Sequence, residues 1–547
     1  MKISEKHYPY ILVAACLLLF FPHLDVLYAN IMEARNFNTA REMLEHNNWV
    51  LTTMNGEARY EKPPLPTWLA ALSAALFGIT KLWALRLPSA IISTVLVLFS
   101  FSFSRKRLQL SAKQSLYASL ILATSFYILF SGRNGTWDIF AHAFMLGGIY
   151  YLFQFFSSTD QKYRNAALAG LFIGLSFMSK GPVSHFALLL PFLIAYIWVF
   201  KLHSYKTRIA PFTLMILTAL GLSSWWALAI YFGDSDTATA IADKEATAWA
   251  NRNTRPFYYY WSFFTQSGIW TIPAFVSLLY PYLKTRVANL KAYRFSLIWT
   301  LAAVVLLSCI PEKKSRYLLP VLIPLALNIS FYIEYLVRRF PALSDKRETI
   351  PVYFYFSIIT IAAVLAAPAA LFLFADQLEG SLWFWYASLQ ISSLFIAIII
   401  VKSLQQKRIE RAFFAVVIFA CAIVSFAFPL VELSYTNEDY EQIAPKVADL
   451  LHEEKPLYLF ENSSPELIWD LGQRVPVLKT RDGLQLPEQA SFYLIVEEER
   501  TQEVEELLAD YALQRVHCYD GNITTKADRN YKSRRIGCLY LVKKIDQ

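Results

Sequence analysis

Charged residues are scarce in this sequence: Asp, Glu, Lys and Arg make up only 17% of its 547 residues, while 56% are hydrophobic. A soluble fold cannot bury that much apolar surface, so the scarcity excludes an ordinary water-soluble protein and predicts a chain solvated by lipid. The net charge of +9 is compatible with nucleic-acid binding. However, the basic residues occur in short runs between apolar stretches, so we expect membrane lipids and no nucleic acid as partners.

Several motifs of nucleotide and hydrolase chemistry are also absent. The sequence has no glycine-rich phosphate loop, no Cys/His cluster with metal-ligand spacing and no nucleophile elbow. These absences disfavour nucleotide-driven transport and hydrolysis. No internal repeat is obvious, which weakens a transporter built from inverted repeats. The pattern requires no cofactor, although carboxylates outside the membrane leave a divalent cation open.

Apolar runs of spanning length dominate the first 430 residues. We predict thirteen membrane crossings and treat the apolar stretch 65–83 as a helix that lies at the membrane interface. The crossings are expected near residues 8–24, 86–104, 115–132, 139–157, 165–179, 183–200, 210–232, 266–283, 295–310, 318–337, 351–374, 382–401 and 412–430.

Basic runs set the orientation of these crossings. With 65–83 at the interface, the N-terminus and most basic runs face the cytoplasm, as the positive-inside rule requires. These runs are 105–107, 201–208, 284–294, 338–347 and 402–411. We therefore predict a multi-pass protein of the bacterial inner membrane whose transmembrane domain is 1–430. Its outer loops 25–85 and 233–265, its active site and a domain at 431–547 would then lie on the periplasmic side.

The composition after residue 431 is that of a soluble domain. Helical patterns at Tyr440–His452 and Thr501–Tyr511 alternate with short strand-like runs, so we predict a small α/β domain. The strand-like runs are Pro456–Phe460, Val475–Leu478, Phe492–Val496 and Leu539–Val542. In an oxidising compartment Cys518 and Cys538 are candidates for a disulfide, and two free thiols are the alternative.

Seven short strings follow one another along the chain and lie mostly in outer segments. They are Arg41–Leu44, Tyr60–Pro64, Leu85–Ser89, Arg133–Asp138, Ser179–Pro182, Arg255–Tyr259 and Lys314–Pro320. With these strings the sequence resembles the membrane-embedded glycosyltransferases of the GT-C class, in the branch that holds protein O-mannosyltransferases and aminoarabinose transferases of lipid A. The resemblance covers roughly residues 1–330.

The resemblance implies a mainly α, GT-C-like membrane fold and transfer of a sugar from a polyprenyl-phosphate donor. The acceptor would be an outer-leaflet lipid such as lipid A, another glycan or a protein. Arg35 and Lys62 match the family's phosphate-binding positions, where cations stabilise the charge of the leaving phosphate. A local ion pair with Glu33 or Glu61 is the alternative for both.

Further cations on the outer side are candidates for the same phosphate. They are Lys180, Lys313, Lys314 and Arg316. The last three break the charge rule, which suggests a ligand, with simple headgroup contact as the alternative. The strings also provide candidates that position the substrate, namely Tyr60, Glu61, Arg133, Arg255, Tyr258 and Tyr259.

Two carboxylates are the candidate catalytic residues. The family usually carries Asp-Glu in the first outer loop, whereas this chain has Met32-Glu33, so Glu33 is expected to take over. A phosphate acceptor, already anionic, would tolerate the missing Asp better than a hydroxyl would. Asp138 fits the second acidic position, where it removes a proton from the acceptor or orients it; a helix N-cap is the alternative.

Two rival functions remain open from the sequence. A transporter or flippase of a lipid-linked sugar would need the same cations but no carboxylate at the reacting carbon. The other rival is a non-catalytic subunit that lost its activity when Met32 took the place of the usual Asp.

Overall fold

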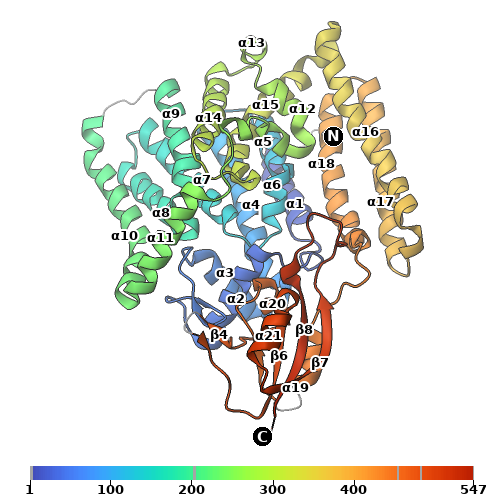
Figure 1. The fold of residues 1–547 in the computed structure, drawn as a ribbon. Helices are drawn as coiled ribbons and strands as arrows, with labels where there is room; N and C mark the ends of the chain where they lie inside the picture. Colours follow the sequence, from blue (N-terminus) through green and yellow to red (C-terminus); the bar gives the residue numbers. More distant parts are fainter. Residues whose placement is uncertain (1–3, 201–204, 452–454, 481–482, 546–547) are drawn as a thin grey trace.

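The computed structural model describes residues 4–200, 205–451, 455–480 and 483–545, and this part of the chain is mainly helical (Figure 1). Eight of its helices are long and apolar enough to cross a membrane, or nine if one bent pair counts as a single span. They are α4 (Leu82–Lys106), α7 (Asp138–Ser157), α10 (Ile209–Gly233), α14 (Leu290–Cys309), α15 (Leu322–Arg339, within the helical run 315–342), α16 (Lys346–Phe374), α17 (Leu382–Gln405) and α18 (Ile409–Ala422, within 409–431). The predicted multi-pass membrane fold is confirmed, and the count of thirteen crossings stays a prediction.

Shorter helices complete the layer, and one predicted span differs from what the structure shows. They are α1 (Tyr8–Phe20), α5 (Ala112–Thr124), α6 (Phe126–Gly132), α8 (Lys162–Lys180) and α9 (Leu190–Phe200), with α5 and α6 bent by 66°. The span predicted at 266–283 is not one continuous helix. It is divided into a 3-10 segment, Phe263–Trp270, followed by α12 (Thr271–Ser277) and α13 (Tyr280–Leu283). Gly268 adopts a left-handed φ of 66°, which breaks the helix there.

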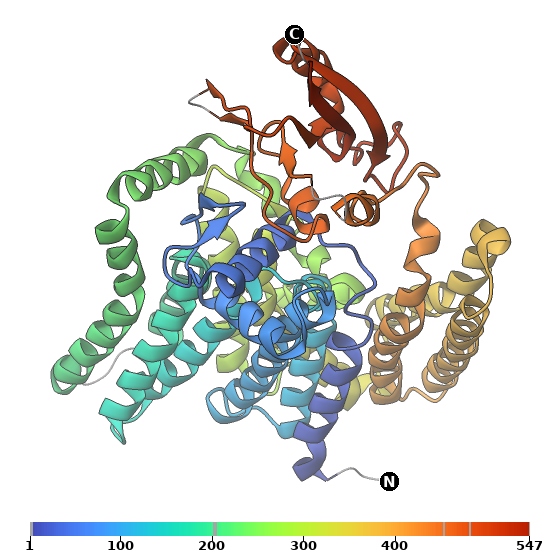
Figure 2. The same ribbon diagram turned by 90° about the horizontal axis from the view of Figure 1, so that it is seen from below.

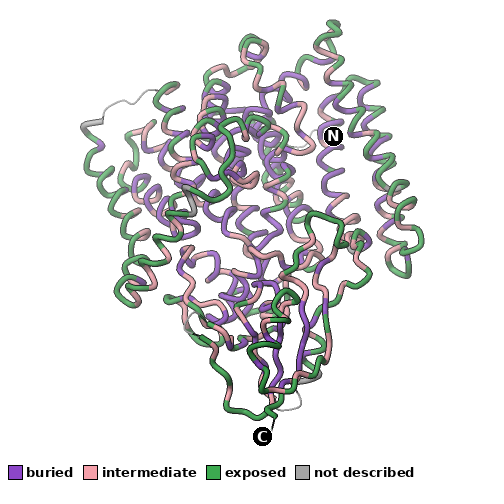
Figure 3. Tube along the Cα trace, in the orientation of Figure 1, coloured by how far each residue is buried: buried purple, intermediate pink, exposed green. Residues whose placement is uncertain are grey.

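Burial separates the centre of the helix layer from its flanks (Figure 3). One buried apolar cluster connects helices from α1 to α18. By contrast, α10 and α16 at the two flanks expose apolar side chains such as Leu217 and Phe372, which is 89% exposed. A surface of this kind is expected where lipid, not water, is the solvent.

Residues 25–85, predicted to be an outer loop and called the outer loop hereafter, contain helices that cover one face of the layer. Helix α2 (Ile31–His46) begins with a capping box, in which Asn30 caps the N-terminus and Glu33 bonds back to the Asn30 N–H. After the short hairpin of β1 (Thr53–Met54) and β2 (Glu57–Ala58), α3 (Leu65–Phe77) ends at Gly78. With 13 residues α3 is about 20 Å long, too short to cross the hydrocarbon core, in agreement with an interface helix. A second outer helix, α11 (Ser235–Asn251), follows α10.

The C-terminal strands form a four-stranded sheet in the order β3-β6-β8-β7, with only β3 and β6 parallel. The strands are β3 (Leu457–Leu459), β6 (Ser491–Glu497), β7 (Tyr511–Asp520) and β8 (Ile536–Lys544), and α19 (Ala444–Leu451), α20 (Pro465–Asp470) and α21 (Thr501–Leu507) accompany them. A separate hairpin joins β4 (Lys479–Thr480) and β5 (Gly483–Leu484).

Most predicted C-terminal elements are confirmed. Strands β3, β6 and β8 and helices α19 and α21 lie where the sequence predicts them. The strand predicted at 475–478 is wrong, because there only Val477 makes an isolated bridge, to Leu459. Edge strand β7 was not predicted. Residues 201–204 of the predicted basic run and His452 of the predicted helix lie outside the described residues.

Hydrogen bonds connect the C-terminal region to the outer loop, and the two lie side by side in Figures 1 and 2. On α2, the amide of Asn38 donates to the carbonyl of Pro465 at 2.9 Å, and Arg41 donates to Ile468 at 3.2 Å. Asn55 makes two bonds with the backbone of Val475, each 2.9 Å long. These buried bonds connect the loop directly to α20 and the residues that follow it.

The structure joins Cys518 and Cys538, paired across β7 and β8, in a disulfide that closes a loop of 20 residues. We expect maleimide labelling of the denatured protein to reach these two cysteines only after reduction, whereas Cys16, Cys309 and Cys421 react without it. Replacing Cys518 and Cys538 by serine should lower the free energy of unfolding of the sheet by about 3 kcal/mol. Limited proteolysis of the C-terminal region should then be faster. Labelling of all five cysteines without reductant would contradict the disulfide.

Candidate active site

Glu33 is part of a buried structural network. It is 1% exposed, and its carboxylate receives a bidentate pair of bonds from Arg86, at 2.7 and 2.9 Å. The same carboxylate accepts the Asn30 side-chain amide at 2.7 Å and the Gly135 N–H at 2.8 Å. Both oxygens are therefore occupied. This geometry makes Glu33 the anchor between α2, α4 and the loop before α7, in contrast with the catalytic role that the sequence predicts.

Removing the partner of Glu33 is expected to destabilise the fold. The variant Arg86→Met should lower the free energy of unfolding by about 3–5 kcal/mol, because it leaves a buried carboxylate without its counter-charge. Thermal unfolding in detergent measures this effect. The double variant Glu33→Gln with Arg86→Met removes the charge as well and should recover part of the loss. An unchanged unfolding temperature for Arg86→Met alone would contradict the structural role.

Asp138 and Lys180 form a second buried ion pair. Asp138 is the first residue of α7, and Lys180 is the last residue of α8, so two helix ends bring them together. The Lys180 Nζ donates to Asp138 Oδ1, and it lies 5.6 Å from the centre of the Tyr317 ring. Asp138 does not cap its helix with its side chain, since Trp137 occupies the N-cap position. Its carboxylate is instead held beside a cation.

Two further predicted cations lie within electrostatic range of this pair. Lys180 interacts with both Arg316 and Lys62, and Asp138 also interacts with Arg316. The buried Nε of Arg316 has no hydrogen-bond partner among the described residues. Lys62, Asp138, Lys180 and Arg316 come from four separate segments of the chain. The structure thus brings them together as one site, hereafter the cation cluster.

Lys62 connects the cation cluster to the outer loop. It pairs with Glu245 of α11 at 2.8 Å, not with Glu61 as the sequence-based alternative assumed, and about a quarter of its side chain is exposed. The neighbouring Arg59 interacts with Arg35, Glu61 and Glu245. Burial lowers the pKa of Arg59 to about 10, and the positive charge of Arg35 adds to that decrease.

Arg35 and Glu61 have unused hydrogen-bonding capacity. Over the ranges that the structure describes, no hydrogen bond or ion pair holds the Arg35 side chain, and the buried Oε2 of Glu61 has no partner. Repulsion between Arg35 and Arg59 would be relieved by an anion bound between them. Both features indicate hydrogen-bonding and charge capacity next to Lys62 that a charged ligand would use.

Positive charges outnumber negative ones across this connected group. The five cations Arg35, Arg59, Lys62, Lys180 and Arg316 face the three carboxylates Glu61, Asp138 and Glu245. The excess of two positive charges would nearly balance the negative charge of a phosphate monoester, which is about −1.5 to −2 at neutral pH. No group of three or more potential His, Cys, Asp or Glu metal ligands occurs in the described part of the chain.

Residues 311–317 contribute less than the sequence predicts. Lys313 is buried and its Nζ donates to the backbone carbonyl of Arg255 at 3.0 Å, so it holds two loops together. Lys314 is neutralised by Glu312 at 2.5 Å. Of the three predicted cations in this segment, only Arg316 keeps free capacity toward the cation cluster.

Five of the predicted substrate-positioning residues divide into three groups. Tyr60 and Tyr259 lie near the cluster: Tyr60 donates to Asp234 at 3.1 Å, and the Tyr259 hydroxyl is 3.2 Å from that of Ser315, beside Arg316. Tyr258 and Arg255 are exposed and make no side-chain bond in the structure's described part. Arg133 points away, since it donates to the carbonyls of Leu19 and His23 at the end of α1. The side chain of Arg133 thus caps the C-terminal end of α1, and its role in positioning the substrate stays a prediction.

Sequence reasoning missed three residues of this region. Arg86 lies within a string that was noted, but its contact with Glu33 spans 53 residues and leaves no local signal. Glu245 lies on α11, whose sequence contains no recognisable motif. Arg59 directly precedes the Tyr60–Pro64 string, and its position beside Lys62 is the one signal that could have found it.

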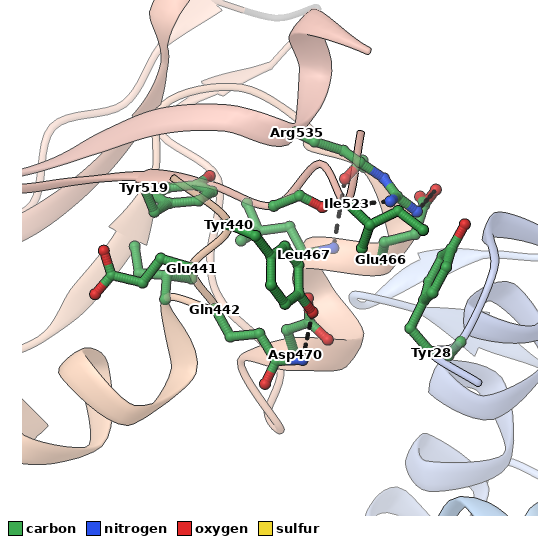
Figure 4. A pocket seen from close by; sticks show the side chains of 14 residues that line it. Tyr28, Tyr440, Glu441, Gln442, Glu466, Leu467, Asp470, Tyr519, Ile523 and Arg535 are labelled. Carbon is green, nitrogen blue, oxygen red and sulfur yellow. Dashed lines mark hydrogen bonds and ion pairs between the residues drawn. The ribbon is translucent and has the colours of Figure 1, made fainter. Parts of the chain in front are cut away.

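A small cavity lies elsewhere, between Tyr28 and the C-terminal region (Figure 4). Its volume is about 30 Å³, enough for one or two water molecules but not for a sugar. The Oε2 of Glu466 and the hydroxyl of Tyr519 are buried there without protein partners. Burial raises the pKa of Asp470 to about 7, although Arg535 partly opposes this. The cavity belongs to the junction between the two regions and is distinct from the cation cluster.

Comparison with known proteins connects this geometry to a class of enzymes. The family of dolichyl-phosphate-mannose-protein mannosyltransferases matches residues 61–227. ArnT from Cupriavidus metallidurans in the apo state superposes with a TM-score of 0.70 over 98% of both chains, at 16% identity. The chain has the GT-C fold. The same protein bound to undecaprenyl phosphate superposes on this GT-C chain with a TM-score of 0.68, at 15% identity and over 98% of both chains.

Curated relatives of this GT-C chain agree in sequence over part of their length. The undecaprenyl phosphate-alpha-4-amino-4-deoxy-L-arabinose arabinosyl transferase of Serratia proteamaculans is 26% identical over 325 residues, 55% of this chain and 54% of the relative. The transferase of the same name from Yersinia enterocolitica is 27% identical over 336 residues, 58% of this chain and 59% of the relative. The chain thus spans little more than half the length of these relatives. The predicted resemblance and fold class are confirmed.

Proposed function

We propose that this protein is a membrane glycosyltransferase that moves a sugar from a polyprenyl-phosphate donor to an acceptor at the outer face of the inner membrane. The observation that carries the proposal is the cation cluster, where Lys180 and Arg316 act on the Asp138 carboxylate and Lys62 lies within electrostatic range of Lys180. The named activity of the relatives and the undecaprenyl phosphate bound in the similar structure support the same donor class.

The charge of the cluster suits the leaving group better than the donor. A polyprenyl-phosphate sugar is a phosphodiester with one negative charge, and breaking its bond to the sugar leaves a monoester with close to two. The excess of two positive charges therefore binds the departing phosphate more tightly than the donor, which lowers the barrier to transfer. Arg35 and Lys62 hold the phosphate, with Lys180 and Arg316 behind it.

The acceptor oxygen attacks the anomeric carbon as the bond from that carbon to the phosphate oxygen breaks. Asp138 is the catalytic carboxylate: it removes the proton of a hydroxyl acceptor, or orients an acceptor phosphate that has no proton to lose. Glu33 is a positioning residue, because its bond to the Gly135 N–H fixes the loop that leads into Asp138. The missing Asp at position 32 is then compatible with an anionic acceptor such as the phosphate of lipid A.

The site is assigned to the periplasmic side. The positive-inside rule places the basic loops in the cytoplasm and the loop 25–85 opposite them. The Cys518–Cys538 disulfide supports the same side for the C-terminal region, since disulfides persist in oxidising compartments. We treat 1–430 as the transmembrane domain and 431–547 as the periplasmic domain.

Mass spectrometry of envelope lipids and glycans from a deletion strain tests the proposal. The expected result is one glycolipid or glycan species that loses a constant mass increment of one sugar, while its unmodified form accumulates. The increment and the species that loses it identify the sugar and the acceptor. Spectra identical to those of the parent strain, under conditions in which the protein is made, would contradict the proposal.

A further inference from the structure

A groove of about 740 Å³ opens at the end of the helix layer opposite the C-terminal strands, where α13 lies in Figure 1. Its walls come from the C-terminal end of α9, from α13 and from the first turns of α14. The lining is mostly apolar and aromatic, with two basic side chains among it: Trp198, Val199, Tyr280, Leu290, Lys291, Arg294, Leu297 and Ile298. This groove takes no part in the transfer described above.

The two basic side chains of the groove are not neutralised by carboxylates. Lys291 is exposed and lies 4.6 Å from the centre of the Phe200 ring, and Arg294 donates to the Tyr280 hydroxyl at 2.8 Å. Neither forms an ion pair with any described carboxylate. The adjacent residues 201–204, which lie outside the described ranges, are Lys-Leu-His-Ser and supply no acid by sequence. By comparison, Arg286 nearby is paired with Glu348.

The start of α14 adds to the positive potential of the groove. This helix has 20 residues, and Lys291 and Arg294 lie in its first two turns, where the helix dipole is positive. The side chain of Asn289 accepts a hydrogen bond from the N–H of Ala292, so this backbone group already has a partner within the protein. The charge that remains unmatched is therefore that of the two basic side chains.

We propose that this groove binds the headgroup phosphate of an anionic phospholipid, with the acyl chains lying along α9 and α14. Trp198, 75% exposed at the rim, lies where tryptophan is enriched in membrane proteins, at the border between headgroups and hydrocarbon. Below it, Leu297 and Ile298 continue the apolar wall. Basic pockets between membrane helices on the cytoplasmic side bind anionic headgroups by this combination of charge and apolar surface. The inference does not depend on the reaction that the protein catalyses.

Native mass spectrometry of the delipidated full-length protein, titrated with phosphatidylglycerol or phosphatidylcholine, measures this binding. We expect phosphatidylglycerol to bind in preference, and the double variant Lys291→Ala with Arg294→Ala to bind it about 25-fold more weakly, about fivefold or ~1 kcal/mol for each cation. The control variant Lys346→Ala with Arg347→Ala removes the same charge from exposed residues at the start of α16 and should bind as the wild type does. Equal binding of both lipids, or equal losses in both double variants, would overturn the proposal.

Two further measurements, competition with inorganic phosphate and photolabelling, distinguish the remaining outcomes. Inorganic phosphate in excess should not displace the lipid, because it lacks the acyl chains; displacement would mean a simple anion site and would refute the lipid. If the double variant does not fold, a photoreactive phosphatidylglycerol applied to the wild-type protein should label peptides that contain Trp198 or residues 290–298. Labelling confined to other helices would refute the groove.

Discussion

The variant Lys62→Ala is expected to lower transfer about 10²–10³-fold while the protein stays folded in the membrane. Lys62 is a partly exposed cation of the cluster, with about a quarter of its side chain exposed, so a donor phosphate can reach it directly. Removing one preorganised charge that stabilises the developing phosphate costs this much in catalysis. The measurement is the amount of modified glycolipid or glycan, by mass spectrometry, in a deletion strain that carries the variant.

The control for this prediction is Glu245→Gln. It breaks the same ion pair from the other side but leaves the Lys62 charge in place. Because the pair is about one-quarter to one-third exposed, losing it costs less than about 1 kcal/mol, and transfer should stay within a few-fold of the wild type. If both variants lose activity equally, Lys62 acts through its contact with α11 and not on the phosphate. Normal transfer by Lys62→Ala would remove it from the site.

The variant Asp138→Asn is expected to bind the donor and fail to turn it over, with a rate about 10²–10⁴-fold lower. Asparagine keeps the shape of the side chain but can neither accept a proton nor carry the negative charge. Copurified polyprenyl-phosphate lipid, detected by mass spectrometry, reports binding, and envelope glycans report turnover. A transporter or flippase would keep moving its substrate with this change, so full activity of Asp138→Asn would favour that rival.

A second variant separates catalysis from charge balance, because Asp138→Asn also leaves Lys180 as a buried cation without its partner. The double variant Asp138→Asn with Lys180→Met removes both charges. If Asp138 served only to neutralise Lys180, this double variant would transfer sugar at least as fast as Lys180→Met alone, in which the cation to be neutralised is already absent. The catalytic role predicts that the double variant is slower than Lys180→Met although its thermal stability recovers.

The sequence predicted the class of fold, and it named the candidate residues that the structure brings together, for identifiable reasons. Apolar runs and basic loops are properties of the local chain, so membrane helices such as α4, α7 and α14 could be located without coordinates. Lys62 and Asp138 lie in short strings typical of a known family. Their convergence with Arg316 was expected only because each string lies on the same side of the predicted topology.

What the sequence could not predict depends on distant contacts. Arg133 was assigned to the substrate because it lies in one of the family strings, but the carbonyls that it caps, at the end of α1 and just after it, lie more than 100 residues away. Glu33 has the residue type of a catalytic base, and only its bonds to Arg86 and Gly135 reveal a structural function. Edge strand β7 escaped because most of its residues are partly or fully exposed, so it lacks the continuous buried apolar run that marks β6 and β8.

The site also predicts where a bound donor must lie. The cation cluster has an excess of positive charge, and unused groups occur on its Arg316 and on the adjacent Arg35 and Glu61. A phosphate monoester bound there would draw Lys62 away from Glu245, since it carries close to two negative charges and the carboxylate of Glu245 carries one.

The most direct measurement is an experimental structure of this protein with undecaprenyl phosphate bound. We predict that the phosphate lies among Arg35, Lys62 and Arg316, with an oxygen about 3 Å from the Lys62 Nζ, and that the Lys62–Glu245 ion pair is broken. A phosphate bound outside this cluster, with Lys62 still on Glu245, would contradict the account.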